Sequence, residues 1–166
     1  PTFFTGFAPV DFPGTMSRLD GEVLKEMYAN FGGSLFIEKE ATFDRLQQIK
    51  NTKLLHLSTH ATAGKGHPYL MLTDTVWFQQ LFSLSFNADL AVLDASETGT
   101  GEQQPGEGIM SLARGFQYAG ARSLLTTLWV ADEKAINMIS STFYKHLEAG
   151  HPKSWALNQA KRDFLN

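Results

Sequence analysis

The chain has 166 residues, of which 43% are hydrophobic and 19% charged, and its formal net charge is −3 at pH 7. These values are typical of one soluble globular domain with a sizeable core. Lysine and arginine do not cluster, which argues against nucleic acid as a partner, because phosphate binding needs concentrated positive charge. No apolar run approaches the roughly 20 residues of a membrane helix, so we expect neither a membrane span nor a signal segment.

Two further features concern the origin of the chain. It begins with Pro1 rather than Met, so we expect it to be excised from a longer protein or processed. It contains no cysteine, so no disulfide framework is expected. This composition is compatible with a reducing compartment, and we expect a cytoplasmic location.

Hydrophobic periodicity predicts strands and helices that alternate along the chain. In the first half, strands are predicted at residues 2–8, 34–37, 53–57 and 69–72, and helices at 19–31, 43–49 and 77–84. In the second half, strands are predicted at 90–93 and 122–128, and helices at 109–116, 132–147 and 154–165. Polar or glycine-rich composition predicts loops at residues 59–69 and 94–107.

This alternation predicts the fold class. Strands that alternate with helices favour an α/β fold, a mostly parallel sheet with helices on both faces. Two of the predicted strands are continuously apolar, as expected where both faces of a parallel sheet are covered. No repeat, linker or low-complexity segment interrupts the chain, so one three-layer α/β/α sandwich is expected over residues 1–166.

Two polar residues follow the two most apolar strands. His60 comes shortly after residues 54–57, and Ser96 shortly after residues 90–93. Open α/β sheets place their active sites at the carboxyl ends of their strands, so an imidazole and a hydroxyl are expected at one edge of the sheet. Imidazole can move protons near neutral pH, although a loop histidine and a turn serine would look the same. His56 lies within the predicted strand and is expected to be a core histidine.

Other chemistries are poorly supported. Ser96 lacks the Gly-x-Ser-x-Gly elbow of serine hydrolases, and no spacing reveals a carboxylate that would orient its base. The glycine-rich segment at residues 99–108 lacks the Gly-Lys-Ser/Thr ending of a phosphate cradle and contains Glu102 and Glu107, which would repel phosphate. No histidine or carboxylate spacing resembles a metal site. We therefore expect no cofactor and no metal.

Taken together, these segments resemble the CHAT domain, a member of the caspase-like (clan CD) cysteine peptidases. The two most specific segments are residues 55–61, which resemble the family's histidine segment, and residues 88–102, which resemble a segment that in the family contains Ser-Ala-Cys-Glu-Thr-Gly. The resemblance continues over residues 106–116, 119–123, 127–132, 143–144 and 156–160.

The resemblance implies a caspase-like fold and a peptidase mechanism. It makes His60 the catalytic base and position 96 the nucleophile, with the backbone N–H groups of Ala61 and Ser96 as the oxyanion hole. The sequence departs from the family at the nucleophilic atom itself, because Ser96 stands where the family has cysteine. A hydroxyl cannot ionise as a thiol does, so we expect little or no peptidase activity. An engineered cysteine-to-serine replacement and a natural pseudo-peptidase both remain open.

Three residues are candidates for substrate binding. Asp94 stands where many CHAT domains have serine, and it resembles the aspartate with which metacaspases and clostripain-like peptidases bind a basic P1 side chain. A strand-end aspartate that accepts hydrogen bonds from backbone N–H groups explains it equally well. Trp129 could line the pocket, although core packing would also explain it. Asp132 could face the site, although helix capping explains it adequately.

Three function classes follow from this sequence. The leading prediction is a cysteine endopeptidase domain that cleaves a specific protein or peptide substrate. In this chain it is expected to be inactive, because Ser96 replaces the catalytic cysteine. An interaction module that binds a peptide or protein without chemistry is the alternative, and a serine hydrolase is disfavoured by the missing elbow. The resemblance further implies a bacterial origin and a fused or separate helical-repeat regulatory partner.

Overall fold

Two long parallel strands lie at the centre of the fold. The structure is a computed structural model, and it describes residues 2–14, 16–62, 67–97, 107–128 and 131–166. Strand β3 (Asn51–Thr62) runs parallel to β6 (Asn87–Glu97), and the two strands pair from Asn51 to Ala61. Most of the described side chains on both strands are buried, as expected for strands that are covered on both faces.

Three further strands complete the parallel part of the sheet. β1 (Thr2–Ala8) pairs with β3 on the side opposite β6, and β2 (Ser34–Ile37) pairs with β1. On the other side, β7 (Leu124–Thr126) pairs with β6. The order of the parallel strands is therefore β2-β1-β3-β6-β7. Beyond the last β1 pair, the end of β3 pairs antiparallel with β4 (Tyr69–Met71), which in turn pairs with β5 (Thr75–Trp77).

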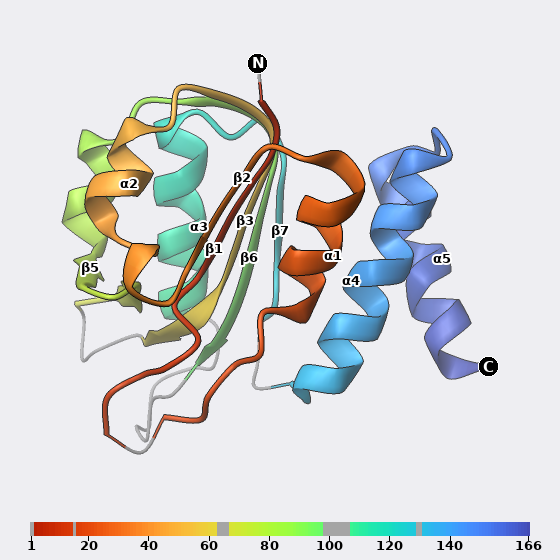
Figure 1. Cartoon of the computed structure of the whole chain (residues 1–166), viewed down its shortest axis with the longest axis horizontal. Helices are drawn as coiled ribbons and strands as arrows, with labels where there is room; N and C mark the ends of the chain where they lie inside the picture. The colour runs from red at the N-terminus through yellow and green to blue at the C-terminus, as the bar shows by residue number, and fades with distance from the viewer. Residues whose placement is uncertain (1, 15, 63–66, 98–106, 129–130) are drawn as a thin grey trace. The chain divides into compact units, whose positions relative to one another are not determined.

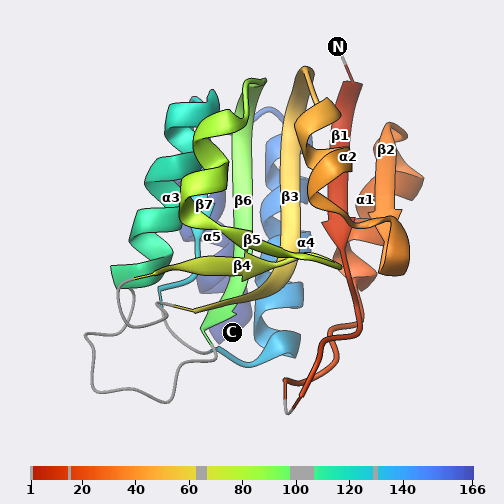
Figure 2. The same ribbon diagram turned by 90° about the vertical axis from the view of Figure 1, so that its left-hand side faces the viewer.

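Helices cover both faces of this sheet. Helix α1 (Glu22–Phe31) lies on one face, and α2 (Phe43–Gln48) and α3 (Glu107–Ala119) lie on the other (Figures 1 and 2). Successive side chains of a strand point to opposite faces of the sheet, so each strand contributes to the core on both faces. Leu55 and Leu57 of β3 belong to the hydrophobic cluster on the face that α2 and α3 cover. Two short 3₁₀ helices, η1 (Glu38–Glu40) and η3 (Phe78–Ser83), lie in the connections.

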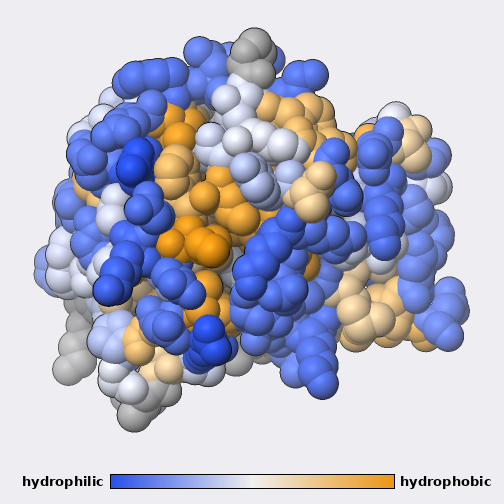
Figure 3. Space-filling view, in the orientation of Figure 1, coloured by the Kyte–Doolittle hydropathy of each residue, from blue (hydrophilic) through white to orange (hydrophobic). Residues whose placement is uncertain are grey.

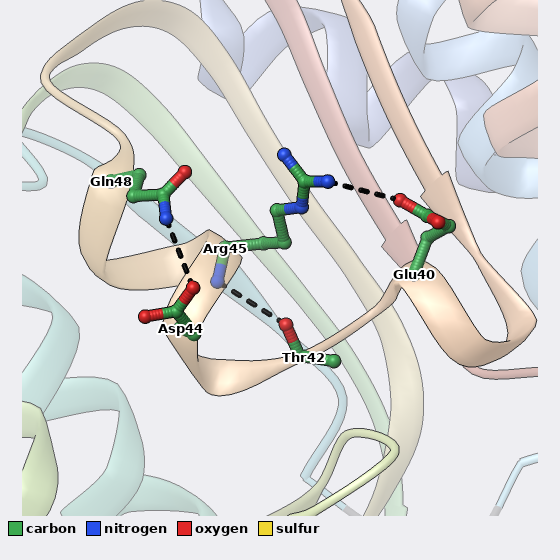
Figure 4. Close-up of polar contacts among 5 residues, drawn as sticks. All are labelled: Glu40, Thr42, Asp44, Arg45 and Gln48. Atoms are coloured by element: carbon green, nitrogen blue, oxygen red, sulfur yellow. Dashed lines mark hydrogen bonds and ion pairs between the residues drawn. The ribbon is translucent and has the colours of Figure 1, made fainter.

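Local contacts fix the start of α2 (Figure 4). The Thr42 hydroxyl accepts a hydrogen bond from the Arg45 backbone N–H at 3.3 Å, which satisfies one of the free donors of the first turn. The Arg45 guanidinium lies 3.4 Å from Glu40, and the Gln48 amide donates to Asp44 at 2.9 Å. These contacts all lie within residues 40–48 and stabilise the first turns of the helix that precedes β3.

The outer strand β2 presents a partly apolar edge. Its residues Leu35, Phe36 and Ile37 are half-buried. The Phe36 ring packs 5.0 Å from Phe7, and the Arg45 guanidinium lies 5.5 Å from its centre. Figure 3 shows apolar residues gathered in the region of β2 and the adjoining α2. The remaining visible surface of these elements is largely hydrophilic, so the apolar surface is confined to this edge of the sheet.

The last two helices form a second compact unit, Ala131–Asn166. Helices α4 (Glu133–Glu148) and α5 (Lys153–Leu165) pack against each other. Within this unit, His146 Nε2 lies 3.0 Å from a carboxylate oxygen of Asp163, and this pairing lowers the pKa of Asp163. Across the described part of the chain, no helix is long and apolar enough to cross a membrane.

The structure confirms the predicted fold class and corrects several boundaries. The predicted strands at 2–8 and 34–37 match, but β3 and β6 are longer than the apolar runs 53–57 and 90–93. The predicted loops at 59–69 and 94–107 are wrong at 59–62 and 94–97, which are strand. Polar residues extend β3 because the strand stays paired, with β6 as far as Ala61 and with β4 at Ala61 and Thr62. In addition, the Thr59 hydroxyl donates to the Met71 carbonyl oxygen.

Candidate functional site at the carboxyl ends of β3 and β6

His60 and Ser96 are neighbours across the central pair of strands. The parallel register pairs His60 with Ser96, Ser58 with Asp94, and Ala61 with Glu97. Neighbouring strands lie about 4.8 Å apart in the direction of their hydrogen bonds, so the backbones of the predicted base and the predicted nucleophile are adjacent. Both residues lie near the ends of their strands rather than in the loops after them. The predicted meeting of these two positions at one sheet edge is therefore confirmed.

The connection between β1 and α1 covers His60. His60 Nε2 lies 2.7 Å from the backbone carbonyl oxygen of Ser17. The aromatic ring of Phe12, from the same connection, meets the imidazole edge to face, with 4.5 Å between ring centroids and 76° between planes. As a result, His60 is only 2% exposed. No sequence signal could have identified Ser17, because its contribution is a backbone carbonyl, which every residue type has.

The Ser17 carbonyl determines which imidazole nitrogen is protonated. A carbonyl oxygen can only accept, so Nε2 of His60 must be the N–H donor in this contact. In the neutral ring the other nitrogen, Nδ1, then has a free lone pair. Among the described residues, the buried Nδ1 has no hydrogen-bond partner. Whenever its ring is neutral, His60 is therefore in a defined tautomer, with the Ser17 carbonyl oxygen as its orienting group on the Nε2 side.

The topology places this cluster at the expected position for a binding site. The chain passes outward from β1 to β2, then returns to β3 and proceeds in the opposite direction to β6 and β7. The strand order therefore reverses between β1 and β3. In open α/β sheets, ligands bind outside the carboxyl ends of the strands at such a switch point. Phe12 and Ser17 follow β1, and His60 lies at the end of β3, so all three border it.

Asp94 and Ala61 lie next to the central pair. Asp94 is half-buried and precedes Ser96 by two residues on β6. Its register partner is Ser58, which lies on the same face of β3 as His60 because the two are separated by one residue. Ala61 is buried and pairs with Leu70 of β4 as well as with Glu97. Asp94, which is predicted to bind the P1 side chain, and Ala61, which is predicted to contribute to the oxyanion hole, therefore lie next to His60 and Ser96 in the sheet.

The other predicted residues fall elsewhere. Trp129 lies outside the described residues. Asp132 caps α4 in the second unit, where its carboxylate accepts from the Ala135 N–H at 3.1 Å. This confirms the capping interpretation, and a role in substrate binding stays a prediction. His56 is fully buried, as predicted for a core histidine, and burial lowers its pKa to about 3. In the described ranges, no group of three histidine or carboxylate side chains could hold a metal ion.

The fold is thus an α/β domain in which a histidine held by a backbone carbonyl lies beside position 96, the predicted nucleophile, at the switch point of the sheet. This arrangement is suited to acyl transfer, in which a base and a nucleophile act on one carbonyl. The model of the CHAT domain family matches residues 3–166. The chain therefore belongs to the CHAT domain family, which is associated with cysteine-peptidase-like function. No curated protein sequence matches the chain.

Proposed function

We propose that this domain is a caspase-like cysteine endopeptidase domain whose nucleophile position, 96, holds serine, and that the chain as it stands is inactive. The observation that best supports this proposal is the Nε2 contact of His60 with the Ser17 carbonyl, beside Ser96 in the register. The substrate class is a protein or peptide that reaches the carboxyl ends of β3 and β6. A reducing cytoplasm would keep a thiol at position 96 available.

The proposed chemistry with cysteine at position 96 is acyl transfer. The thiol proton passes to Nδ1 of His60, and the sulfur attacks the scissile carbonyl carbon. The backbone N–H groups of Ala61 and residue 96 would stabilise the oxyanion. His60 then protonates the leaving amine as the C–N bond breaks. Finally, a water molecule deprotonated by His60 attacks the thioester, which releases the acid and restores the thiol.

The group that orients His60 explains why serine is a poor substitute. In serine hydrolases, a carboxylate stabilises the imidazolium that forms when the hydroxyl proton is transferred. Here the orienting group is a neutral carbonyl, that of Ser17, which lacks a full negative charge. A thiol, with a pKa of about 8.5, can ionise with this weaker help, whereas a hydroxyl cannot. The site is thus suited to a sulfur nucleophile.

The direct test is the S96C variant, compared with the unmodified chain and with S96A. We expect S96C to cleave peptides from a positional library at least about 100-fold faster than S96A, since general acid–base catalysis contributes that much or more. The unmodified chain should match S96A. S96C should also be labelled by a peptidyl acyloxymethyl ketone, which reports a reactive thiol even when the best substrate is unknown.

The control is the double variant H60A/S96C, which keeps the thiol but removes the base. It should lose both cleavage and labelling. A folded S96C protein that neither cleaves any library peptide nor reacts with the ketone would refute the peptidase proposal and favour a non-catalytic binding module. Labelling of the unmodified chain by a fluorophosphonate would instead indicate a serine hydrolase.

The proposed specificity is cleavage after arginine or, less well, lysine. Asp94 supports it, because its half-buried carboxylate lies two residues before the nucleophile position and beside Ser58. A carboxylate pairs with guanidinium through two parallel hydrogen bonds, which favours arginine over lysine.

We further propose that a helical-repeat protein or domain regulates access to the site.

A further inference from the structure

The imidazole of His60 needs more than one contact to keep its orientation. The Nε2 hydrogen bond to Ser17 fixes one atom of the ring. Nδ1 has no hydrogen-bond partner among the described residues, so a single hydrogen bond would leave the ring free to tilt about it. A tilted ring would move Nδ1 away from the nucleophile, and proton transfer is sensitive to such displacement.

Phe12 supplies a second contact, made to the face or edge of the ring. Its ring meets the imidazole at 4.5 Å between centroids and at 76°, which is the edge-to-face geometry that aromatic rings prefer. Phe12 is half-buried and Ser17 is exposed, whereas His60 is only 2% exposed. The β1–α1 connection therefore shields the imidazole from water and touches it with two residues that are five positions apart.

A backbone hydrogen bond and an ion pair join the two ends of this connection. The Leu19 N–H donates to the Val10 carbonyl at 3.0 Å, and Arg18 lies 3.1 Å from Asp11. Val10 has a φ of 72°, a conformation that β-branched residues rarely adopt. Such backbone strain persists only where the surroundings over-determine it, and it clusters at functional sites. Here it marks the point at which the chain turns from β1 toward Phe12.

We propose that Phe12 is a positioning residue for His60: it holds the imidazole so that Nε2–H stays on the Ser17 carbonyl and the Nδ1 lone pair stays available to the nucleophile. This inference rests on the proposed function for its catalytic consequence. Its structural content, the tautomer and protection of His60, can be measured in the unmodified chain without any activity.

The first experiment is nitrogen-15 NMR of the histidine side chains in the unmodified chain and in F12A, F12Y and F3A. In the unmodified chain, His60 should give the Nε2–H tautomer with an observable, slowly exchanging proton. F12A should lose this signal to exchange with water and show mixed tautomers. F12Y keeps the ring and should retain the signal. F3A is the matched control, because Phe3 is a partly exposed aromatic that stacks on Phe31 instead of on His60.

The second experiment repeats these substitutions in the S96C background. F12A should lower kcat about tenfold while KM changes less than twofold, and F12Y should restore kcat to within twofold. A protected Nε2–H tautomer in F12A, or an unchanged kcat in F12A/S96C, would overturn the inference. If S96C itself is inactive, the proposed function fails and the NMR result alone decides the role of Phe12. Should F12A not fold, F12L replaces it in both experiments, because leucine keeps the apolar volume and removes the ring.

Discussion

Asp94 is the residue whose charge decides the proposed specificity. A charge-assisted hydrogen bond is worth about 1.5–3 kcal/mol, which corresponds to roughly a 10- to 160-fold change in kcat/KM. In the S96C background, D94N should therefore lower kcat/KM for a peptide with arginine at P1 by that factor. A matched peptide with leucine at P1 should be cleaved at an unchanged rate, since asparagine keeps the shape of the side chain.

The control for this substitution is S58A, which alters the register partner of Asp94 without removing a charge. It should leave the ratio of arginine to leucine cleavage within about twofold, because no ionic contact is lost. Unchanged selectivity in D94N, or a preference of S96C for acidic or aliphatic P1 residues, would show that Asp94 only accepts backbone hydrogen bonds at the strand end.

Individual residues differ in how far the sequence could reveal them. That His60 and Ser96 lie side by side could be predicted, because each follows an apolar run and parallel strands end at a common edge. The capping role of Asp132 could be predicted from its place before a helical pattern. The contacts of Ser17 and Phe12 with His60 could not be predicted, since a backbone carbonyl has no sequence signature and a phenylalanine after a strand is most often a packing residue.

At the scale of elements, the extents of β3 and β6 show where periodicity fails. Apolar runs predicted only the middle of each strand, because the ends contain serine, threonine, histidine and aspartate, which are typical of loops. The ends remain strand because they pair with each other and, at Ala61, with β4. Strand pairing is a tertiary contact, so no local window of sequence contains it.

The junction of α3 with β7 depends on a glycine. Gly120 has a φ of 128°, and a Cβ built there would lie 1.7 Å from the Phe86 carbonyl oxygen. This oxygen belongs to the residue just before β6, and backbone hydrogen bonds from Phe86 to Ala119 and from Ala88 to Gly120 hold the two segments together. G120A should therefore destabilise the protein by at least about 3 kcal/mol, from backbone strain and overpacking together. Urea unfolding measures this free energy.

G32A is the control that separates backbone strain from overpacking. Gly32 also has a positive φ, 65°, but a Cβ there would meet nothing within 4 Å. It should cost about 1–2 kcal/mol, since only the backbone conformation is unfavourable for alanine. Equal losses of unfolding free energy in G120A and G32A would show that α3 and β6 do not approach as closely as described.

At the scale of the whole molecule, the sheet order could not be read from the sequence. Alternating strands and helices predicted a parallel sheet with covered faces. The same alternation fits several strand orders, and it does not single out the observed order β2-β1-β3-β6-β7, which places the switch point beside His60. The β4–β5 hairpin was also only half predicted, because Thr75–Trp77 is too short for an alternating pattern.

The central position of β3 also has a consequence for the stability of the whole fold. His56 lies in the middle of this strand, between Gly6 of β1 and Val92 of β6, and is fully buried. Burial disfavours the charged imidazole and lowers the pKa of His56 from 6.5 to about 3. Between these values the unfolded chain binds a proton that the folded chain does not, so folding stability falls as the pH falls.

The expected loss is up to about 1.4 kcal/mol per pH unit below pH 6.5, which amounts to about 4–5 kcal/mol at pH 3. Urea unfolding at a series of pH values from 8 to 4 measures it, and H56L is the variant that isolates it. Leucine cannot be protonated, so H56L should show a shallower decline toward acid even if it is less stable at pH 8. H56Q, which is polar but does not titrate, should show the same shallower decline. Parallel curves for the unmodified chain and both variants would mean that the acid sensitivity originates in the carboxylates instead of in His56.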